Sequence, residues 1–354
     1  MKPDLPARRK TIAQSVSAQA SAVALALAAL PLAAQTTKDK PVPVNAFNFA
    51  RAETDNYFGK AVEDGAFGKL RHRRAPVSID KQDVVRMNRD TLYSYGVFDL
   101  DAAPVTITLP DTGKRFMSMQ VVSEDHYTPE VVYAPGQYTY TKEKVGTRYV
   151  QFIIRTLADP QDAADVKAAN ALQDAIKVEQ ASVGRFEVPN WDPVTLKKAR
   201  DALNTLGALG GASNFFGKKE EVDPVSFLIG TAGGWGGNPS YAAIYLPVWP
   251  KPDDAKTVQR LTVKDVPVDG FWSISVYDKA GFFAKNELSA YSLNSLTAKP
   301  DANGAYTVQF GGCTKTTANC LPITDGWNYI VRLYRPRAEI QGGSWKFPVA
   351  QPVK

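Results

Sequence analysis

Short apolar segments separated by turn-forming residues fill the first half of the chain. From Asp90 to Thr156, runs of β-branched and aromatic residues alternate with Gly, Pro, Asp and Asn. This pattern is typical of antiparallel strands. The predicted strands are 97–100, 105–109, 116–122, 131–133, 138–141 and 149–154. Many short strands with this punctuation indicate a sandwich or a barrel.

The last third of the chain, from Tyr241 onward, repeats the same pattern. Its predicted strands are 243–246, 260–263, 271–277, 306–310 and 329–334. The tetrapeptides 278–281 and 301–304 each begin with Asp and end with Gly, which favours tight hairpin turns. We therefore predict a second antiparallel sandwich.

Helical patterns occur before the first β-rich region and between the two. Apolar residues interspersed with acids over 45–60 predict an amphipathic helix. Three further helices are predicted at 160–177, from 192–193 onward and from 223 to 229, each with a proline at its start.

The predicted fold class is therefore mainly β, with two antiparallel β-sandwich domains and a helical insert between them. The N-terminal β domain is expected at 45–158, the helical insert at 159–230 and the C-terminal β-sandwich at 231–354.

The first residues predict export rather than a part of the fold. Four basic residues precede an alanine-rich apolar run in 1–34, which is typical of a secretory signal peptide removed near Ala34. We expect a periplasmic or secreted protein with no membrane span after cleavage; the export route, general or twin-arginine, stays open.

Removing 1–34 takes away four basic residues and one acidic residue, so the formal net charge falls from +6 to +3. The remaining Lys and Arg residues form no cluster dense enough to follow a phosphate backbone. Nucleic acid is therefore not an expected partner.

Two cysteines, Cys313 and Cys320, are the only ones in the chain. In an exported protein this pair favours a disulfide that closes a small loop, with a reactive thiol pair as the alternative. Neither the cysteines nor the two histidines have the spacing of a metal site, so we predict no metal and no cofactor.

The densest group of charged and polar residues lies at 84–95, between apolar runs. It contains Arg86, Asn88, Arg89 and Asp90. One interpretation is an Arg–Asp pair that holds a β-bend; the other is a guanidinium left free to bind a carboxylate or phosphate. In a regular strand, Arg86, Asn88 and Asp90 would face a cleft while Arg89 would face the interior.

Several motifs carry a resemblance to a known family. They are R-M-N-R-D-T-L-Y at Arg86–Tyr93, P-V-T-I-T-L-P-D at Pro104–Asp111, R-F-M-S-M-Q at Arg115–Gln120, G-W-G-G-N-P at Gly234–Pro239, V-P-V-D-G-F-W-S-I-S-V-Y-D at Val266–Asp278, and R-L-Y-R-P-R at Arg332–Arg337 with Trp345. From about Asn45 to its end, the chain resembles the DUF1254/DUF1214 family of bacterial proteins. The resemblance implies jelly-roll-like sandwiches; some members carry an esterase or hydrolase label.

The sequence leaves two functions open. No G-x-S-x-G elbow is present, so a standard α/β-hydrolase serine is excluded. The first hypothesis is hydrolysis of a small anionic or ester-type substrate in an inter-domain cleft, with Asp90, His126 and Arg86 as catalytic residues. The second is a non-catalytic envelope protein that binds a carbohydrate or a lipid head group.

Both hypotheses use the same candidate binding residues: Asn88, Arg89, Tyr93, Trp235 and Trp272. Trp235 lies among five glycines at 230–239, where a flexible backbone can approach a ligand closely. The aromatic residues are also what sandwich cores are built from. The expected partner is a small molecule or glycan, and a homo-oligomer is compatible with the sequence.

Overall fold

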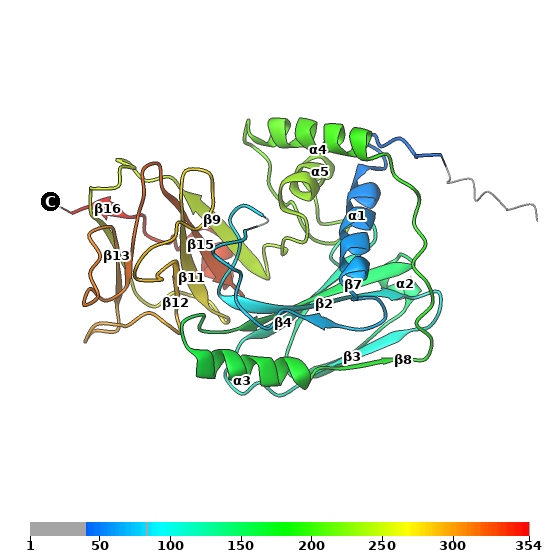
Figure 1. Ribbon diagram of the computed structural model, residues 1–354, viewed down its shortest axis with the longest axis horizontal. Coiled ribbons are helices and arrows are strands. Elements are labelled where there is room, and N and C mark those ends of the chain that lie inside the picture. The colour runs from blue at the N-terminus through cyan, green and yellow to red at the C-terminus, as the bar shows by residue number, and fades with distance from the viewer. Residues whose placement is uncertain (1–39, 83, 354) are drawn as a thin grey trace, which may run out of the picture. The chain divides into compact units, whose positions relative to one another are not determined.

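The computed structural model describes residues 40–82 and 84–353 (Figure 1). The fold is mainly β with several antiparallel sheets, as the sequence predicted. The predicted signal peptide at 1–34 lies outside the described residues. Within the described ranges, no helix is both long and apolar enough to cross a membrane.

Two sheets form the first sandwich. One has the order β1 (Arg71–His72), β2 (Thr91–Asp99), β7 (Tyr149–Leu157), β4 (Met117–Ser123), β5 (Val131–Tyr133), and the other has the order β6 (Gly136–Tyr140), β3 (Val105–Leu109), β8 (Lys177–Gln180). Ile107, Met119 and Phe152 belong to one buried cluster between them. Strand β8 comes from the segment that was predicted as the helical insert.

Helices cover the other face of the five-stranded sheet. Helix α1 (Phe49–Glu63) packs Phe58 against Val97 and Tyr149 of this sheet. Helices α4 (Pro193–Gly207) and α5 (Pro224–Gly234) contribute apolar residues to a second cluster with α1. Helix α3 (Ala163–Asp174) lies on the opposite side, next to the three-stranded sheet (Figure 1), and packs Ala169 beside Leu92. The five-stranded sheet is therefore buried on both faces, which explains why every residue of β7 is buried.

The helix starts follow the sequence signals. Asp162, Asp192 and Asp223 cap α3, α4 and α5 by accepting hydrogen bonds from backbone N–H groups of the first turn. Helix α5 continues to Gly234, beyond the predicted end at residue 229. Its Gly230 lies against Phe215, where a Cβ would come within 2.7 Å of the Phe215 Cβ, so close packing requires glycine there.

The second sandwich also contains two sheets. Their strand orders are β14 (Cys320–Leu321), β13 (Tyr306–Phe310), β10 (Gln259–Val263), β16 (Gln351–Pro352), and β12 (Ser292–Asn294), β11 (Trp272–Tyr277), β15 (Asn328–Tyr334), β9 (Ala243–Val248). Strands β13 and β14 pair in parallel. The predicted disulfide between Cys313 and Cys320 is present. Two short helices, α2 (Lys142–Val145) and α6 (Ala338–Gln341), complete the described elements.

Strands β11 and β15 carry two different buried faces. Trp272, Ile274 and Val331 point into the core of the second sandwich. Five of the alternate residues are polar or aromatic and equally buried: Ser273, Ser275, Tyr277, Arg332 and Tyr334. We call these five residues the polar sheet face. Buried polar groups need hydrogen-bond partners, so another part of the chain must supply them.

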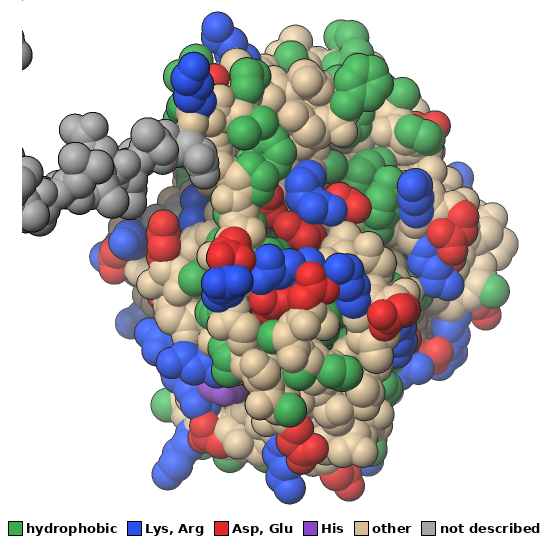
Figure 2. All heavy atoms as spheres, turned by 90° about the vertical axis from the view of Figure 1, so that its right-hand side faces the viewer, with side chains coloured by type: hydrophobic (Ala, Val, Ile, Leu, Met, Phe, Trp, Pro, Cys, Tyr) green, Lys and Arg blue, Asp and Glu red, His purple; other side chains and the backbone are tan. Residues whose placement is uncertain are grey.

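Acidic and basic side chains are intermingled on the side of the molecule that carries α1 and α4 (Figure 2). The ion pairs of this region include Arg51 with Asp125 and Arg200 with Glu53. These two arginines are thus paired with nearby carboxylates.

Candidate functional site

The charged segment 84–90 crosses the polar sheet face as a turn. Arg86 adopts a positive φ of 54°, and β2 begins only at Thr91. The Arg86 carbonyl accepts a hydrogen bond of 2.9 Å from Arg332, and the Met87 carbonyl accepts one of 2.7 Å from the Tyr277 hydroxyl. Backbone carbonyls of this segment therefore satisfy part of the polar sheet face.

This turn makes the predicted alternation of faces wrong. Asp90, expected in a cleft, is fully buried and accepts a hydrogen bond of 3.2 Å from Asn294. Burial raises the pKa of Asp90, while the Arg332 charge opposes this shift. Arg89, expected inside, is only half-buried: it donates to the Val77 carbonyl and lies over the Tyr291 ring. The alternation fails because Arg86 and its neighbours are not in an extended strand.

The two arginines of the segment have no carboxylate partner among the described residues. The Arg86 guanidinium lies 5.7 Å from the centre of the Trp249 ring, and the Arg89 guanidinium lies 5.4 Å from that of Tyr291. The predicted Arg–Asp pair at the bend is therefore not among the ion pairs of the described chain.

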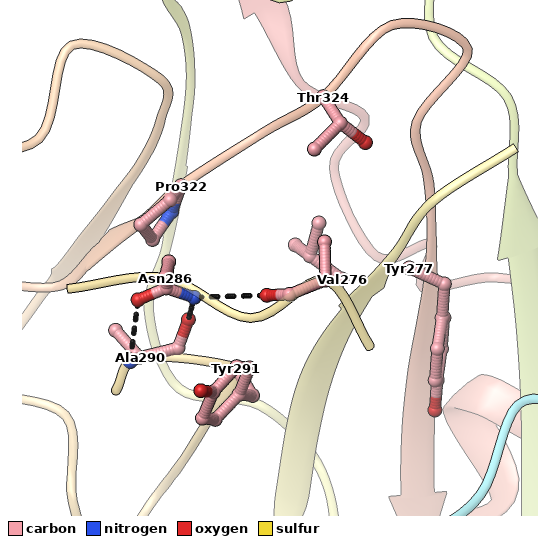
Figure 3. Close-up of a pocket in the computed structure, with 8 residues that line it drawn as sticks. Val276, Tyr277, Asn286, Ala290, Tyr291, Pro322 and Thr324 are labelled. Atoms are coloured by element: carbon pink, nitrogen blue, oxygen red, sulfur yellow. Dashed lines mark hydrogen bonds between the residues drawn. The ribbon is translucent and has the colours of Figure 1, made fainter. Parts of the chain in front are cut away.

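A small cavity lies beside Tyr277 and Tyr291 (Figure 3). Its volume is about 10 Å³, which is the lower limit for one water molecule. Asn286 closes it by hydrogen bonds to the backbone of Ala290 and Ala284. This cavity is too small for a substrate.

Asn88 connects the two sandwiches. Its amide nitrogen lies 3.1 Å from the Thr91 hydroxyl, 3.3 Å from the Tyr93 hydroxyl and 3.1 Å from the Tyr334 hydroxyl. Tyr93 belongs to β2 and Tyr334 to β15, so Asn88 brings a phenol from each sandwich into one cluster.

Arg155, which sequence reasoning missed, lies at the centre of this cluster. It stands opposite Tyr93 in the β2–β7 register, and its guanidinium lies 5.5 Å from the centre of the Tyr93 ring. It donates hydrogen bonds of 2.9 Å to Gln120, 3.3 Å to Asn238 and 3.1 Å to the Gly236 carbonyl. We call Asn88, Tyr93, Arg155, Tyr245 and Tyr334 the arginine–tyrosine cluster.

The cluster reaches solvent at Tyr245 of β9. Asn238, which accepts from Arg155, donates a hydrogen bond of 2.9 Å to the Tyr245 hydroxyl. Tyr245 is 37% exposed, and Trp249, which follows shortly after it in the sequence, is 56% exposed. Arg155, in contrast, is only 5% exposed. The polar groups thus extend from a buried guanidinium to an aromatic rim.

The cluster shifts the pKa values of its two linked phenols in opposite directions. Burial raises the pKa of Tyr93, but the Arg155 charge and the Asn88 hydrogen bond outweigh it, so the net pKa lies below the ordinary value. Burial also raises the pKa of Tyr334, and here the increase prevails. Phenols with separated pKa values are what a proton donor and a proton acceptor require.

His126 lies beside the cluster, where it makes structural hydrogen bonds. Its Nε2 accepts a hydrogen bond of 2.9 Å from the Gly236 N–H, and its Nδ1 lies 2.8 Å from the Thr231 hydroxyl. Burial lowers the pKa of His126 to about 3. The ring is therefore neutral near pH 7, with both nitrogens occupied, and it binds the N–H of Gly236, the residue whose carbonyl accepts from Arg155.

The rings of Trp235 and Trp272 make their contacts with residues outside the arginine–tyrosine cluster. The Trp235 ring stacks on Tyr57 with centroids 4.3 Å apart and donates to the Thr54 hydroxyl. Trp272 lies in the core of the second sandwich against Phe347. The glycine segment still reaches the cluster, because Gly236 binds Arg155 directly.

No metal centre is evident in the part of the chain that the structure describes, since no three His, Cys, Asp or Glu side chains gather in a way that could hold an ion. The donors that do gather at the arginine–tyrosine cluster are guanidinium, amide and phenol groups, which recognise anions and polar hydroxyls.

Two family models match this mainly β protein. Residues 67–144 match "Protein of unknown function (DUF1254)", and residues 251–338 match "Protein of unknown function (DUF1214)". The chain therefore carries both regions, which confirms the resemblance inferred from the motifs. No curated protein matches the sequence.

Solved structures share the fold. The VPA0106 protein from Vibrio parahaemolyticus superposes with a TM-score of 0.68 at 20% identity, covering 87% of this chain and 98% of that one. An uncharacterized protein from Burkholderia cenocepacia superposes with a TM-score of 0.50 at 13% identity, covering 87% of each chain. At these identities the likeness concerns the fold alone.

Proposed function

We propose that this protein binds a small anionic ligand, a carboxylate or a phosphate, at the arginine–tyrosine cluster. The environment of Arg155 carries the proposal. The guanidinium is buried, and its partners among the described residues are the amide oxygens of Gln120 and Asn238, a backbone carbonyl and the Tyr93 phenol, none of which is a carboxylate. A buried charge without a counter-charge is costly, so an anion at this place is strongly favoured.

The neighbouring groups suit an anion attached to a polar body. A guanidinium can hold two oxygens of a carboxylate or phosphate at once. The Asn88 amide and the Tyr334 hydroxyl add hydrogen bonds, and the exposed ring of Tyr245 offers a face for a sugar or other flat group. A carbohydrate acid and a phosphorylated lipid head group share this chemistry.

Hydrolysis of a small anionic or ester-type substrate has weaker support. Asp90 is fully buried, and both nitrogens of His126 are engaged by Thr231 and Gly236. An acid–base reaction remains a second candidate because the pKa of Tyr93 is lowered beside Tyr334, whose pKa is raised. In that case Tyr93→Phe would retain binding and lose turnover.

The proposed location is the periplasm or the outside of the cell. The basic and alanine-rich start of the chain and the disulfide between Cys313 and Cys320 support it.

Thermal unfolding and calorimetry with two anions test the binding proposal. The probes are D-glucuronate and glycerol 3-phosphate, with glucose and glycerol as their uncharged controls. We expect one anion to raise the melting temperature while its uncharged control does not. Arg155→Gln should weaken that binding about ten- to a hundredfold, the range expected for losing charge-assisted hydrogen bonds.

A matched control is Arg260→Gln, because Arg260 also donates to a glutamine oxygen, that of Gln309 in the second sandwich. This variant should bind as the wild type does. If Arg155→Gln does not fold, Arg155→Lys retains the charge and should still lose most of the affinity through loss of the forked geometry. Equal binding by wild type and a folded Arg155 variant, or no binding of either anion, contradicts the proposal.

A further inference from the structure

An apolar pocket lies on the other face of the sheet that carries the arginine–tyrosine cluster. Along β9, Tyr245 points toward the cluster, whereas its neighbours Ile244 and Leu246 point into the second sandwich. Strand β9 is the edge strand of its sheet (Figure 1). The pocket is bounded by this edge and by the segment 340–349.

The pocket is large enough to hold a ligand. Its volume is about 370 Å³, more than twice that of a cavity of about 150 Å³ known to bind benzene. The lining residues are mostly apolar: Ile244, Leu246, Val248, Val331, Leu333, Ile340, Trp345, Phe347, Pro348 and Val349. Ile244, Leu246 and Val248 are only partly buried, although the inward residues of β11 and β15 are buried. Apolar side chains left open in this way favour an apolar occupant.

One positive charge stands among these apolar residues. Lys346 lines the pocket, is exposed, and forms no ion pair with any residue in 40–82 or 84–353. The lining therefore combines an apolar interior with a single cationic group, which complements a molecule with an alkyl chain and an anionic end.

We propose that this pocket binds the alkyl chain of a single-chain anionic amphiphile, with its head group near Lys346. The site is separate from the arginine–tyrosine cluster and goes beyond the function proposed for it. None of its residues belongs to that cluster, so either proposal can fail without the other.

Calorimetric titration with octanoate, decanoate and dodecanoate, each below its micelle-forming concentration, tests the proposal. Affinity should rise roughly fourfold for each methylene that enters an apolar site, until the pocket is full. Leu246→Trp fills the pocket and should weaken dodecanoate binding at least tenfold. If that variant does not fold, Val248→Phe serves the same purpose.

Lys346→Gln tests the charge. It should weaken decanoate binding several-fold and leave the binding of uncharged decan-1-ol unchanged. Lys264→Gln is the control, because Lys264 is another exposed lysine without an ion pair among the described residues, and it should change neither. Dodecanoate binding that is absent, independent of chain length, or unchanged in a folded Leu246→Trp or Val248→Phe variant overturns the proposal. So does sedimentation showing that a second copy of the chain occupies the pocket.

Discussion

Replacing Asp55 by asparagine should stabilise the protein at pH 8 and leave its stability at pH 4 almost unchanged. Asp55 lies on α1, is buried, and accepts a hydrogen bond of 2.8 Å from the Trp191 indole. Burial raises its pKa to about 7; Trp191 opposes this shift and the neighbouring Glu124 charge adds to it. At pH 8, therefore, the folded protein must hold an ionised carboxylate at a place that favours the protonated form.

The sign and size of the effect follow from linkage. The folded pKa of Asp55 lies above the unfolded value, so its contribution to stability is fully present below pH 3.8 and is lost as pH rises to about 7. About 3 pH units at about 1.4 kcal/mol each give an upper value of about 4 kcal/mol. Asparagine retains an acceptor for Trp191 and does not titrate. The free energy of unfolding of the variant therefore lacks this decrease with rising pH.

Urea denaturation of both proteins between pH 4 and pH 8 measures the difference in free energy of unfolding. Other groups also titrate: the lowered pKa of buried His126 makes stability rise with pH between about 3 and 6.5. His126 is common to both proteins, so the difference between them reports on Asp55 together with Glu124, the acid that interacts with it. We expect the advantage of Asp55→Asn to grow from near zero to between about 2 and 4 kcal/mol.

Asp125→Asn is the matched control. Asp125 follows Glu124 directly, is 44% exposed, and forms an ion pair of 2.7 Å with Arg51. Loss of such a pair should change stability by less than about 1 kcal/mol. If Asp55→Asn is no more stable than the wild type at pH 8, the ionised carboxylate of Asp55 does not destabilise the folded protein, and this reasoning is refuted.

Two further predictions concern Asp90 and the exported chain. Asp90→Ala should lower the free energy of unfolding by about 3–5 kcal/mol, because it removes a buried acid near a buried arginine. Arg89→Ala should change the free energy of unfolding by less than about 1 kcal/mol. Denaturant melts that give the opposite order would contradict this prediction. Mass spectrometry of periplasmic protein should find a chain beginning near Gln35 and two hydrogens lighter than its reduced form, as a bond between Cys313 and Cys320 requires; a retained N-terminus or free thiols would count against export.

Strand positions were predictable where β-branched and aromatic residues form a short run between turn-forming residues. The segments 105–109, 131–133 and 306–310 coincide with β3, β5 and β13. Strand β8 was missed because Lys177–Gln180 has little apolar pattern and becomes a strand by pairing with β3, about seventy residues earlier in the sequence. Such non-local pairing is not encoded in the segment itself.

The candidate site was predictable only in part. Asn88 and Tyr93 were expected to bind a ligand, and the structure places them in one cluster. Arg155 was missed because its segment, Q-F-I-I-R-T-L, resembles an ordinary strand. The available signal was a charged residue inside the apolar run of a strand covered on both faces, since charged residues are rarely fully buried unless they are paired.

The charged segment 84–90 supplies hydrogen-bond acceptors to the buried donors of the polar sheet face. Ser275 and Tyr277 share the guanidinium of Arg332, and the remaining donors need acceptors from outside their sheet. The positive φ of Arg86 turns the backbone so that its own carbonyl and that of Met87 supply them. The turn also leaves the side chain of Asn88 between the phenols of the two sandwiches. The motif therefore provides hydrogen-bond acceptors through its backbone, and in the proposed anion site it contributes mainly Asn88 rather than the arginines and the aspartate that dominate its sequence.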